Sequence, residues 1–212
     1  MPANADLDGL RAAAKSCQGC HLHEHASQTV FSKGPVSARL VLVGEQPGDI
    51  EDRRGEPFVG PAGKLLDRAV EEAGLDPGHT YTTNAVKHFK FTRRGKKRIH
   101  DKPNRYEIEA CRPWLGAELE AVHPEIVVVL GATAAQSLLG SKFRVTQSRG
   151  IPLDSDLARY TFATVHPASV LRAPDEAQRE EARLAFFADL RVIGECYRRL
   201  GASPLSAAGS RS

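Results

Sequence analysis

Four short apolar runs do most to limit the folds open to this chain of 212 residues. They cover residues 38–44, 81–86, 125–131 and 160–165, and β-branched residues are frequent in them. Near-continuous apolar character is typical of strands that are buried on both faces, as in a parallel sheet. Helical patterns separate the runs, so the sequence predicts an α/β fold: a three-layer α/β/α sandwich with a central, mostly parallel four-stranded sheet.

The intervening segments have the apolar period of a helix. They are residues 61–75, 104–122, 132–140 and 175–200. Asn104 precedes the second of them and Glu107 follows three residues later, which predicts a variant of the capping box at its start.

Composition places the chain among ordinary soluble proteins, with 41% hydrophobic and 26% charged residues. No apolar run approaches the roughly 18 residues of a membrane span, and the first residues lack the apolar core of a signal peptide. We therefore expect a cytoplasmic protein without a membrane partner. One domain is predicted over residues 1–200, followed by a disordered tail over residues 201–212.

One segment makes the chain basic. Residues 87–105 hold nine Lys or Arg and one Asp, a local charge of +8, whereas the rest of the chain holds 20 basic and 25 acidic residues, or −5. Such asymmetry is typical of a nucleic-acid contact. Three apolar residues interleave with the charges and indicate an ordered loop: Phe89, Phe91 and Ile99. Within the stretch KKRIH, the candidate phosphate contacts are Lys96, Lys97 and Arg98.

The cysteines include a C-x-x-C pair, Cys17 and Cys20, in the His-rich stretch CQGCHLHEH. Disulfides are not expected in a cytoplasmic protein. The pair suits zinc, with a further ligand from His21, His23 or His25, and it equally suits an iron–sulfur cluster. The residues alone leave both open.

The first apolar run leads directly into GEQPGDIED, a turn rich in carboxylates. A phosphate-binding loop fits poorly, because the turn is acidic and lacks the Lys-Ser/Thr pair of a Walker motif. In open α/β sheets, ligands bind beyond the carboxyl ends of the strands. Glu45 and Asp52 at such an end suit the positioning of a water molecule or the stabilisation of a developing cation.

His166 follows the fourth apolar run and is predicted at the same edge of the sheet as Glu45. A single histidine is more often structural than catalytic, but this coincidence makes it a candidate hydrogen-bond donor to a leaving group. Leu171 and Arg172 come shortly after it and are candidates to wedge into or grip a nucleic acid.

Five motifs in order carry a family resemblance. GEQPG, GEPFVGPAGKLLD, TNAVKHFK, ACRPWL and HPASVLR resemble the iron–sulfur uracil-DNA glycosylases of families 4 and 5, over almost the whole chain. The basic insertion ending in KKRIH is similar to that of the group called UdgX, and so is Gln46 in the first motif. Members of that group recognise uracil in DNA and become covalently attached to it. Their motif is usually K-R-R-I-H, and Lys97 stands here in place of its first arginine.

The resemblance implies a [4Fe–4S] cluster. Family 4 enzymes hold it with four cysteines, of which three match Cys17, Cys20 and Cys111, while His88 stands near the place of the fourth. Either His88 ligates through an imidazole nitrogen or the site is incomplete. We favour ligation, because iron–sulfur clusters elsewhere accept histidine. The cluster is expected to be structural.

The resemblance also implies which residues bind uracil. Phe58 matches the aromatic residue that stacks on the base, Asn84 the amide that reads its polar edge, and His166 the histidine that bonds a carbonyl oxygen. The backbone N–H groups of residues such as Gln46 are expected to stabilise the departing uracil anion. A glycosylase must extrude its target base, so a closed pocket is expected.

Cleavage of the C1′–N1 bond leaves a uracil anion and a sugar with oxocarbenium character. Glu45 or Asp52 can offset the positive sugar or orient a nucleophile, as carboxylates do in O-glycoside hydrolysis. If the basic loop holds His100 against C1′, its imidazole would capture the sugar in place of water, and no obvious second step would release it. The sequence thus predicts base excision followed by covalent trapping in a single turnover.

Two other hypotheses remain open. In the first, a conventional glycosylase uses water as the nucleophile and the basic loop only grips phosphate. In the second, the chain is a non-catalytic iron–sulfur or zinc protein that binds nucleic acid. The favoured partner is uracil-containing DNA, single strands included, and the protein is expected to be a monomer.

Overall fold

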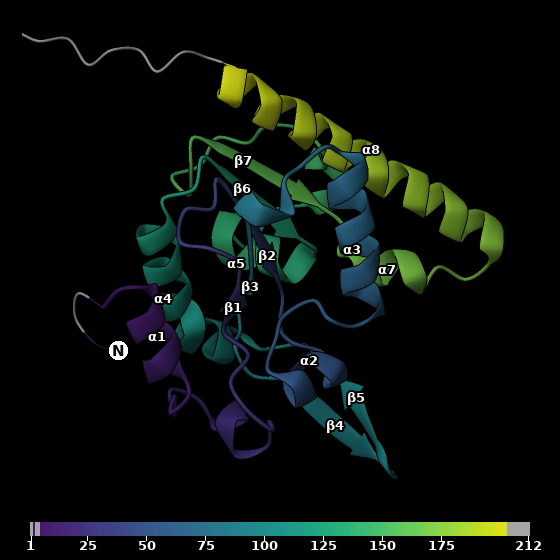
Figure 1. The fold of residues 1–212 in the computed structure, drawn as a ribbon. Coiled ribbons are helices and arrows are strands. Elements are labelled where there is room, and N and C mark those ends of the chain that lie inside the picture. The colour runs from purple at the N-terminus through teal and green to yellow at the C-terminus, as the bar shows by residue number, and fades with distance from the viewer. Residues whose placement is uncertain (1, 3–4, 203–212) are drawn as a thin grey trace, which may run out of the picture.

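A five-stranded sheet forms the middle layer of the computed structural model, which describes residue 2 and residues 5–202 (Figure 1). The strand order is β1-β3-β2-β6-β7. The strands are β1 (Ser32–Lys33), β2 (Leu40–Gly44), β3 (Thr80–Asn84), β6 (Ile126–Leu130) and β7 (Tyr160–Thr164). Strands β2, β3, β6 and β7 run parallel, so their carboxyl ends meet at one edge.

The predicted three-layer α/β fold is confirmed, and the predicted count of four strands is wrong. The four apolar runs form β2, β3, β6 and β7, but β1 adds a fifth strand that pairs antiparallel with β3 at the edge of the sheet. β1 has only two residues, Ser32 and Lys33. A strand this short has neither an apolar run nor an alternation to mark it in the sequence.

Helices cover both faces of the sheet (Figure 1). One face packs against α3 (Pro61–Glu72), α7 (Pro167–Leu171) and α8 (Glu176–Ala202), and the other against α1 (Leu7–Ala14), α4 (Arg105–Val122) and α5 (Ala132–Leu139). The remaining elements are α2 (Asp49–Arg54), α6 (Val145–Ser148), the 3₁₀ helices η1 (His21–Glu24) and η2 (Pro77–His79), and strands β4 (Phe91–Arg94) and β5 (Lys97–His100).

Strand β2 shows why the apolar runs are nearly continuous. Leu40 and Leu42 pack into the core on the α3 and α8 side, while Val41 and Val43 pack into the core on the α1 and α4 side. All four side chains are buried. Successive side chains point to opposite faces of a strand, so a sheet with helices on both faces needs apolar residues at every position.

The predicted capping box starts α4. Asn104 Oδ1 accepts a hydrogen bond of 2.9 Å from the Glu107 N–H, and Glu107 Oε2 accepts one of 2.6 Å from the Asn104 N–H. The box fixes the rotation of α4 from its first turn. Four residues with polar or aromatic groups then fall on its buried face: Glu107, Cys111, Trp114 and Glu118.

Strands β4 and β5 form a separate hairpin that extends beyond α2 in Figure 1. Gly95 opens its two-residue turn at φ 59°, a conformation that glycine adopts without strain in the first position of a type II′ turn. Phe91 pairs with His100, and Arg93 pairs with Arg98. The sequence predicted an ordered basic loop here but not these two strands.

Residues 203–212, most of the predicted tail, lie outside the described residues, and the assignment of residues 1–200 to a single domain stays a prediction. None of the helices within residues 5–202 combines the length and apolar character that crossing a membrane requires.

Gly194 should be essential to the contact between α8 and α3. A methyl group on it would lie 2.1 Å from the carbonyl oxygen of Ala73, where α3 ends, whereas one on Gly116 in α4 would meet nothing within 4 Å. We expect Gly194→Ala to lower the free energy of unfolding by about 1–3 kcal/mol through overpacking. Gly116→Ala, the matched control, should raise it by up to about 1 kcal/mol through helix propensity. Urea denaturation of both variants checks this, and equal effects would contradict it.

Candidate active site

A pocket of about 480 Å³ opens at the carboxyl edge of the parallel strands. Its size is that of a small-molecule site. The pocket brings together seven residues that the sequence singled out, which are Glu45, Gln46, Phe58, Asn84, His100, His166 and Arg172. Asp52, Lys96, Lys97 and Arg98 are not among the residues that line it.

The strand ends place these side chains directly. Glu45 and Gln46 follow β2, Asn84 is the last residue of β3, and His166 comes two residues after β7. The loops after β2 and β3 are tied together, because the Val86 N–H donates to the Glu45 carbonyl at 3.0 Å. Glu45 and Asn84 are therefore held side by side at the pocket wall.

Two glycines make room for this arrangement. A side chain on Gly44 would lie 2.3 Å from Asn84 Oδ1 and 2.7 Å from the Phe58 ring, and one on Gly63 would lie 1.6 Å from the Phe58 carbonyl oxygen. Phe58 itself has φ 56°, in the left-handed region that non-glycine residues rarely adopt. Strain of this kind collects at functional sites, and here it fixes the direction of the Phe58 ring.

The Asn84 side chain is available to a ligand. The residue is 2% exposed, yet within the described part of the chain its amide group makes no hydrogen bond. The rings of Phe58 and His166 lie nearly parallel in the same pocket, with their centroids 6.1 Å apart and their planes at 25°. The pocket thus offers aromatic faces and an unpaired amide, which suits a flat polar ring.

His166 has a defined tautomer. Its Nδ1 accepts a hydrogen bond of 3.2 Å from the Ala168 N–H, so the proton of the neutral ring is on Nε2. Burial lowers the pKa of His166 to about 4, with the nearby Arg172 and His100 as further causes. At neutral pH the residue is therefore an uncharged donor in the pocket.

Glu45 faces His100. The His100 Nε2 and the Glu45 Oε1 lie 3.3 Å apart, within the range of an ion pair. This carboxylate oxygen is buried and makes no hydrogen bond to any described residue. This oxygen is therefore left to accept a hydrogen bond from the imidazole or from a bound molecule.

Comparisons with known proteins show which family the chain belongs to. The family model described as "Uracil DNA glycosylase superfamily" matches residues 31–191. The chain is 37% identical over 159 residues to the type-4 uracil-DNA glycosylase of Thermotoga maritima, covering 74% of this chain and 79% of that protein. It is 36% identical over 197 residues to that of Archaeoglobus fulgidus, covering 89% and 92%, and 34% identical over 193 residues to that of Pyrobaculum aerophilum, covering 86% and 93%.

The chain belongs to the uracil-DNA glycosylase superfamily. The family resemblance seen in its five motifs is thereby confirmed at the level of the superfamily. In this superfamily member, the β4–β5 hairpin brings His100 into the lining of the pocket.

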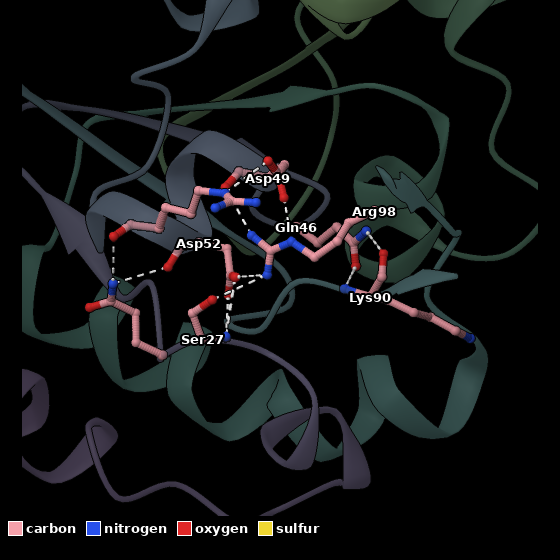
Figure 2. A network of polar contacts seen from close by, with 8 residues as sticks. Ser27, Gln46, Asp49, Asp52, Lys90 and Arg98 are labelled. Carbon is pink, nitrogen blue, oxygen red and sulfur yellow. Dashed lines mark hydrogen bonds and ion pairs between the residues drawn. The ribbon is translucent and has the colours of Figure 1, made fainter. Parts of the chain in front are cut away.

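Arg98 anchors the hairpin to α2 (Figure 2). Its guanidinium forms an ion pair of 2.6 Å with Asp52, a second ion pair with Asp49, and a hydrogen bond of 3.1 Å to Ser27 Oγ. It also lies over the rings of Phe89 and Phe91, at 5.4 and 5.0 Å from their centroids. The side chain is 8% exposed. This burial is at odds with the expected phosphate contact of Arg98.

Asp52 belongs to the same anchor rather than to the pocket. It is fully buried, and its two carboxylate oxygens accept the Ser27 N–H at 3.0 and 3.1 Å in addition to the Arg98 pair. The sequence had left Glu45 and Asp52 as alternative catalytic carboxylates. The geometry separates them, since only Glu45 lines the pocket.

Gln46 closes the base of the hairpin (Figure 2). Its Nε2 donates to the carbonyls of Lys90 and Asp101 at 3.2 and 3.0 Å, and its Oε1 accepts the Lys90 N–H at 3.0 Å. The side-chain amide is thus occupied by the residues just before β4 and just after β5. The backbone N–H of Gln46 makes no hydrogen bond within the described residues, so it is the group left for a ligand.

The alternation of β5 separates the residues of KKRIH. Arg98 and His100 face the protein, where Arg98 meets its carboxylates and His100 meets Glu45. Lys97 and Ile99 face solvent, and Lys96 lies in the turn. Side chains two residues apart share one face of a strand, and this periodicity assigns the histidine to the pocket and Lys97 to the surface.

The predicted cluster ligands lie away from the pocket. Cys20 and Cys111 are buried in one small core group with Leu22 and Val86, and Cys17 Sγ accepts a hydrogen bond of 3.3 Å from the indole N–H of Trp114. Burial is the main cause that raises the pKa of the Cys111 thiol to about 11, and nearby Cys20 and Cys17 contribute to this rise. No three His, Cys, Asp or Glu residues in the described ranges have the arrangement of a formed metal site.

His88 has a nitrogen that fits a ligand role. Thr29 Oγ1 donates its single proton to the Ala14 carbonyl at 2.8 Å, so the His88 Nε2, 2.9 Å from that hydroxyl, must itself be the donor. The lone pair then lies on Nδ1, which is buried and has no hydrogen-bond partner among the described residues. Burial lowers the pKa of His88, which keeps this ring neutral. Three thiols and an orphaned imidazole nitrogen fit the ligand set expected for the cluster.

The anchor predicts the effect of losing Arg98. Arg98→Met leaves Asp52 buried without its cation, and we expect the free energy of unfolding to fall by roughly 3–5 kcal/mol. Amide hydrogen exchange over residues 91–100 should accelerate, because the hairpin is released. The adjacent Lys97→Met, on the solvent side of β5, should change neither quantity. Equal exchange rates in the two variants would show that Arg98 does not hold the hairpin.

Proposed function

We propose that this chain is a uracil-DNA glycosylase of the UdgX type, which excises uracil from DNA and is then trapped on the sugar through His100. The observation that carries the proposal is the contact of His100 with Glu45 Oε1, an oxygen that makes no hydrogen bond to the described residues, in the same pocket as His166. The likeness to type-4 enzymes supports the excision of uracil. The position of His100 on its own hairpin supports the trapping step.

Recognition of the base uses groups that the protein itself leaves unpaired. The Asn84 amide offers a donor and an acceptor to the polar edge of uracil, and the Phe58 ring offers a stacking face. The His166 Nε2–H and the Gln46 backbone N–H are the donors for carbonyl oxygens. The base is flat and apolar on its faces, so stacking and edge contacts together select it.

Bond cleavage follows from charge. As the C1′–N1 bond breaks, its electron pair leaves with uracil and positive charge develops on the sugar. The neutral His166 donates to a uracil oxygen and stabilises the anion, as an oxyanion-hole donor does. Glu45 stabilises the positive sugar from the pocket wall, and Asp52, which is committed to Arg98, has no part in this step.

Trapping follows if the imidazole of His100 is nearer to C1′ than water is. A ring nitrogen donates its lone pair to C1′, the new C–N bond forms, and the ring becomes cationic until it loses the proton of its other nitrogen. Glu45 at 3.3 Å stabilises that charge and can accept the proton. An imidazole held at the site competes with water through its high effective concentration. In the alternative reading, water attacks and the hairpin only grips DNA.

We assign the contacts with the DNA backbone to exposed basic residues. Lys96 and Lys97 lie on the outer part of the hairpin, and Arg172 lines the pocket beside His166. Arg98 positions the hairpin instead of contacting phosphate. Uracil-containing DNA is the proposed partner, single strands included, because the flipped base needs no complementary strand to enter the pocket.

The proposed [4Fe–4S] cluster is held by Cys17, Cys20, Cys111 and His88 Nδ1. When bound it supplies a rigid cross-link between the N-terminal segment, the loop after β3 and α4, with no part in the excision reaction. The chain itself sets the tautomer of His88 through Thr29 and buries Cys111 away from solvent.

A denaturing gel tests the trapping step. The purified protein is incubated with a uracil-containing single-stranded oligonucleotide and then heated in SDS. We expect a shifted band for the wild type and none for His100→Ala, because only the imidazole forms a stable C–N bond. His79→Ala, which removes a histidine that pairs with Asp76 outside the pocket, should keep the band.

Each other result of this gel selects a different reading. Abasic DNA from the wild type without a shifted band would overturn the trapping step and favour hydrolysis by water. Intact uracil DNA in every lane would indicate a binding protein without glycosylase activity.

Iron analysis tests the cluster. We expect His88→Ala to lose iron and acid-labile sulfide, and His88→Cys to retain both, since a thiolate replaces the imidazole. Absorbance near roughly 400 nm, typical of thiolate-bound iron, should follow the same order. The control is His23→Ala, in the N-terminal segment that holds Cys17 and Cys20, because the His23 Nδ1 lies 2.6 Å from the Cys20 carbonyl. Full iron content in His88→Ala would remove His88 from the ligand set.

A further inference from the structure

Behind the pocket lies a buried ammonium group that excision does not use directly. Lys87 is 1% exposed and comes three residues after Asn84. Its Nζ donates to Thr83 Oγ1 at 2.6 Å, to the Asn84 carbonyl at 2.8 Å, and to Glu118 Oε2. These are three acceptors for three N–H bonds, so the ammonium is fully satisfied.

The counter-charge is equally satisfied. Glu118 comes from the buried face of α4 and is 0% exposed. Besides the Lys87 bond, its carboxylate accepts the Tyr81 hydroxyl at 2.8 Å and the Thr83 hydroxyl at 2.9 Å. Burial of a charge pair is tolerated only when the remaining lone pairs and protons also find partners, and this pair meets that condition.

The Asn84 residue is thereby held from both sides. Its side-chain amide is in the pocket and free, while its backbone carbonyl, at the end of β3, is bonded to Lys87. A buried carbonyl that has no hydrogen-bond donor within the sheet requires a donor from elsewhere. An apolar residue at position 87 would pack as well but would leave this carbonyl unpaired, which gives the choice of lysine a reason.

We propose that Lys87 is a positioning residue for base recognition: its buried ammonium, closed by Glu118, fixes the Asn84 carbonyl and so sets the direction in which the Asn84 amide meets the base. The inference rests on the proposed function, since it specifies how the base-reading amide is held. Lys87 touches neither base nor sugar and acts only through Asn84.

Single substitutions here leave a buried charge unpaired and are expected to unfold the protein. The test therefore uses Lys87→Met/Glu118→Leu, which removes both charges and keeps an apolar volume, an exchange that proteins often tolerate. We expect a melting temperature that permits assay at 25 °C and a rate of uracil release in single turnover between roughly tenfold and 100-fold lower, as for a misplaced reacting group. Binding to the same oligonucleotide without uracil should not change.

A double-mutant cycle shows whether the loss passes through Asn84. In an Asn84→Ala background, the same pair of substitutions should slow uracil release by less than about twofold, because the group that it misplaces is already gone. Lys87→Gln/Glu118→Gln, which restores neutral donors, should recover part of the rate. Tyr81→Phe removes a bond from the same network without touching Asn84, so it should lower the melting temperature and leave the rate unchanged.

Several outcomes would overturn the inference. The first is a wild-type rate of uracil release in the folded Met/Leu variant, and the second is an equal loss of that rate in the Asn84→Ala background. The others are no recovery of the rate in the Gln/Gln variant and an equal loss of rate in Tyr81→Phe. A loss of iron from the Met/Leu variant relative to wild type would also overturn it, because Lys87 would then serve the Cys111 region. The proposed function fails separately, if the wild-type protein releases no uracil.

Discussion

Three wholly buried carboxylates organise the site, and each binds one cation from the basic segment. A carboxylate can be removed from water only if a cation and hydrogen-bond donors replace the solvent, so each pair fixes the chain at one point. The pairs are Asp52 with Arg98, Glu107 with Lys90, and Glu118 with Lys87. The first fixes the hairpin, the second its base, and the third the end of β3. Two of the three carboxylates project from α4, whose capping box sets their orientation from the first turn.

These pairs change the meaning of the charge count. Of the nine basic residues in residues 87–105, Lys87, Lys90 and Arg98 are neutralised by buried carboxylates. The segment therefore presents less positive charge to DNA than its composition suggests, and that charge is concentrated at the turn and outer face of the hairpin. A count of charges cannot separate a cation that holds the fold from one that meets a phosphate, because each adds the same unit of charge to the sequence.

The sequence predicted those features that depend on local patterns. Apolar runs marked the four parallel strands, and the meeting of parallel strand ends at one edge predicted Glu45 and His166 together, while Asn84 came from the family resemblance. What it could not predict depends on tertiary contacts: the two-residue strand β1, the clamp of Gln46 on the hairpin base, and the choice between Glu45 and Asp52. One signal was present and unused. Gly95 between Arg94 and Lys96, with Phe89 and Phe91 alternating with polar residues before it, suits a hairpin with a type II′ turn.

The hairpin explains why so many contacts hold the segment that carries His100. An isolated two-stranded hairpin is marginally stable in water, and β4 and β5 have no hydrogen bonds to the main sheet. A nucleophile on a mobile loop would lose its advantage over water, which is present at high concentration everywhere. The proposed capture of the sugar therefore requires that the segment that carries His100 be held rigidly. The Arg98 anchor, the Gln46 clamp and the Phe89 ring beside His100 supply that rigidity. On this argument the balance between trapping and hydrolysis is set by how tightly the hairpin is held, as much as by the imidazole itself.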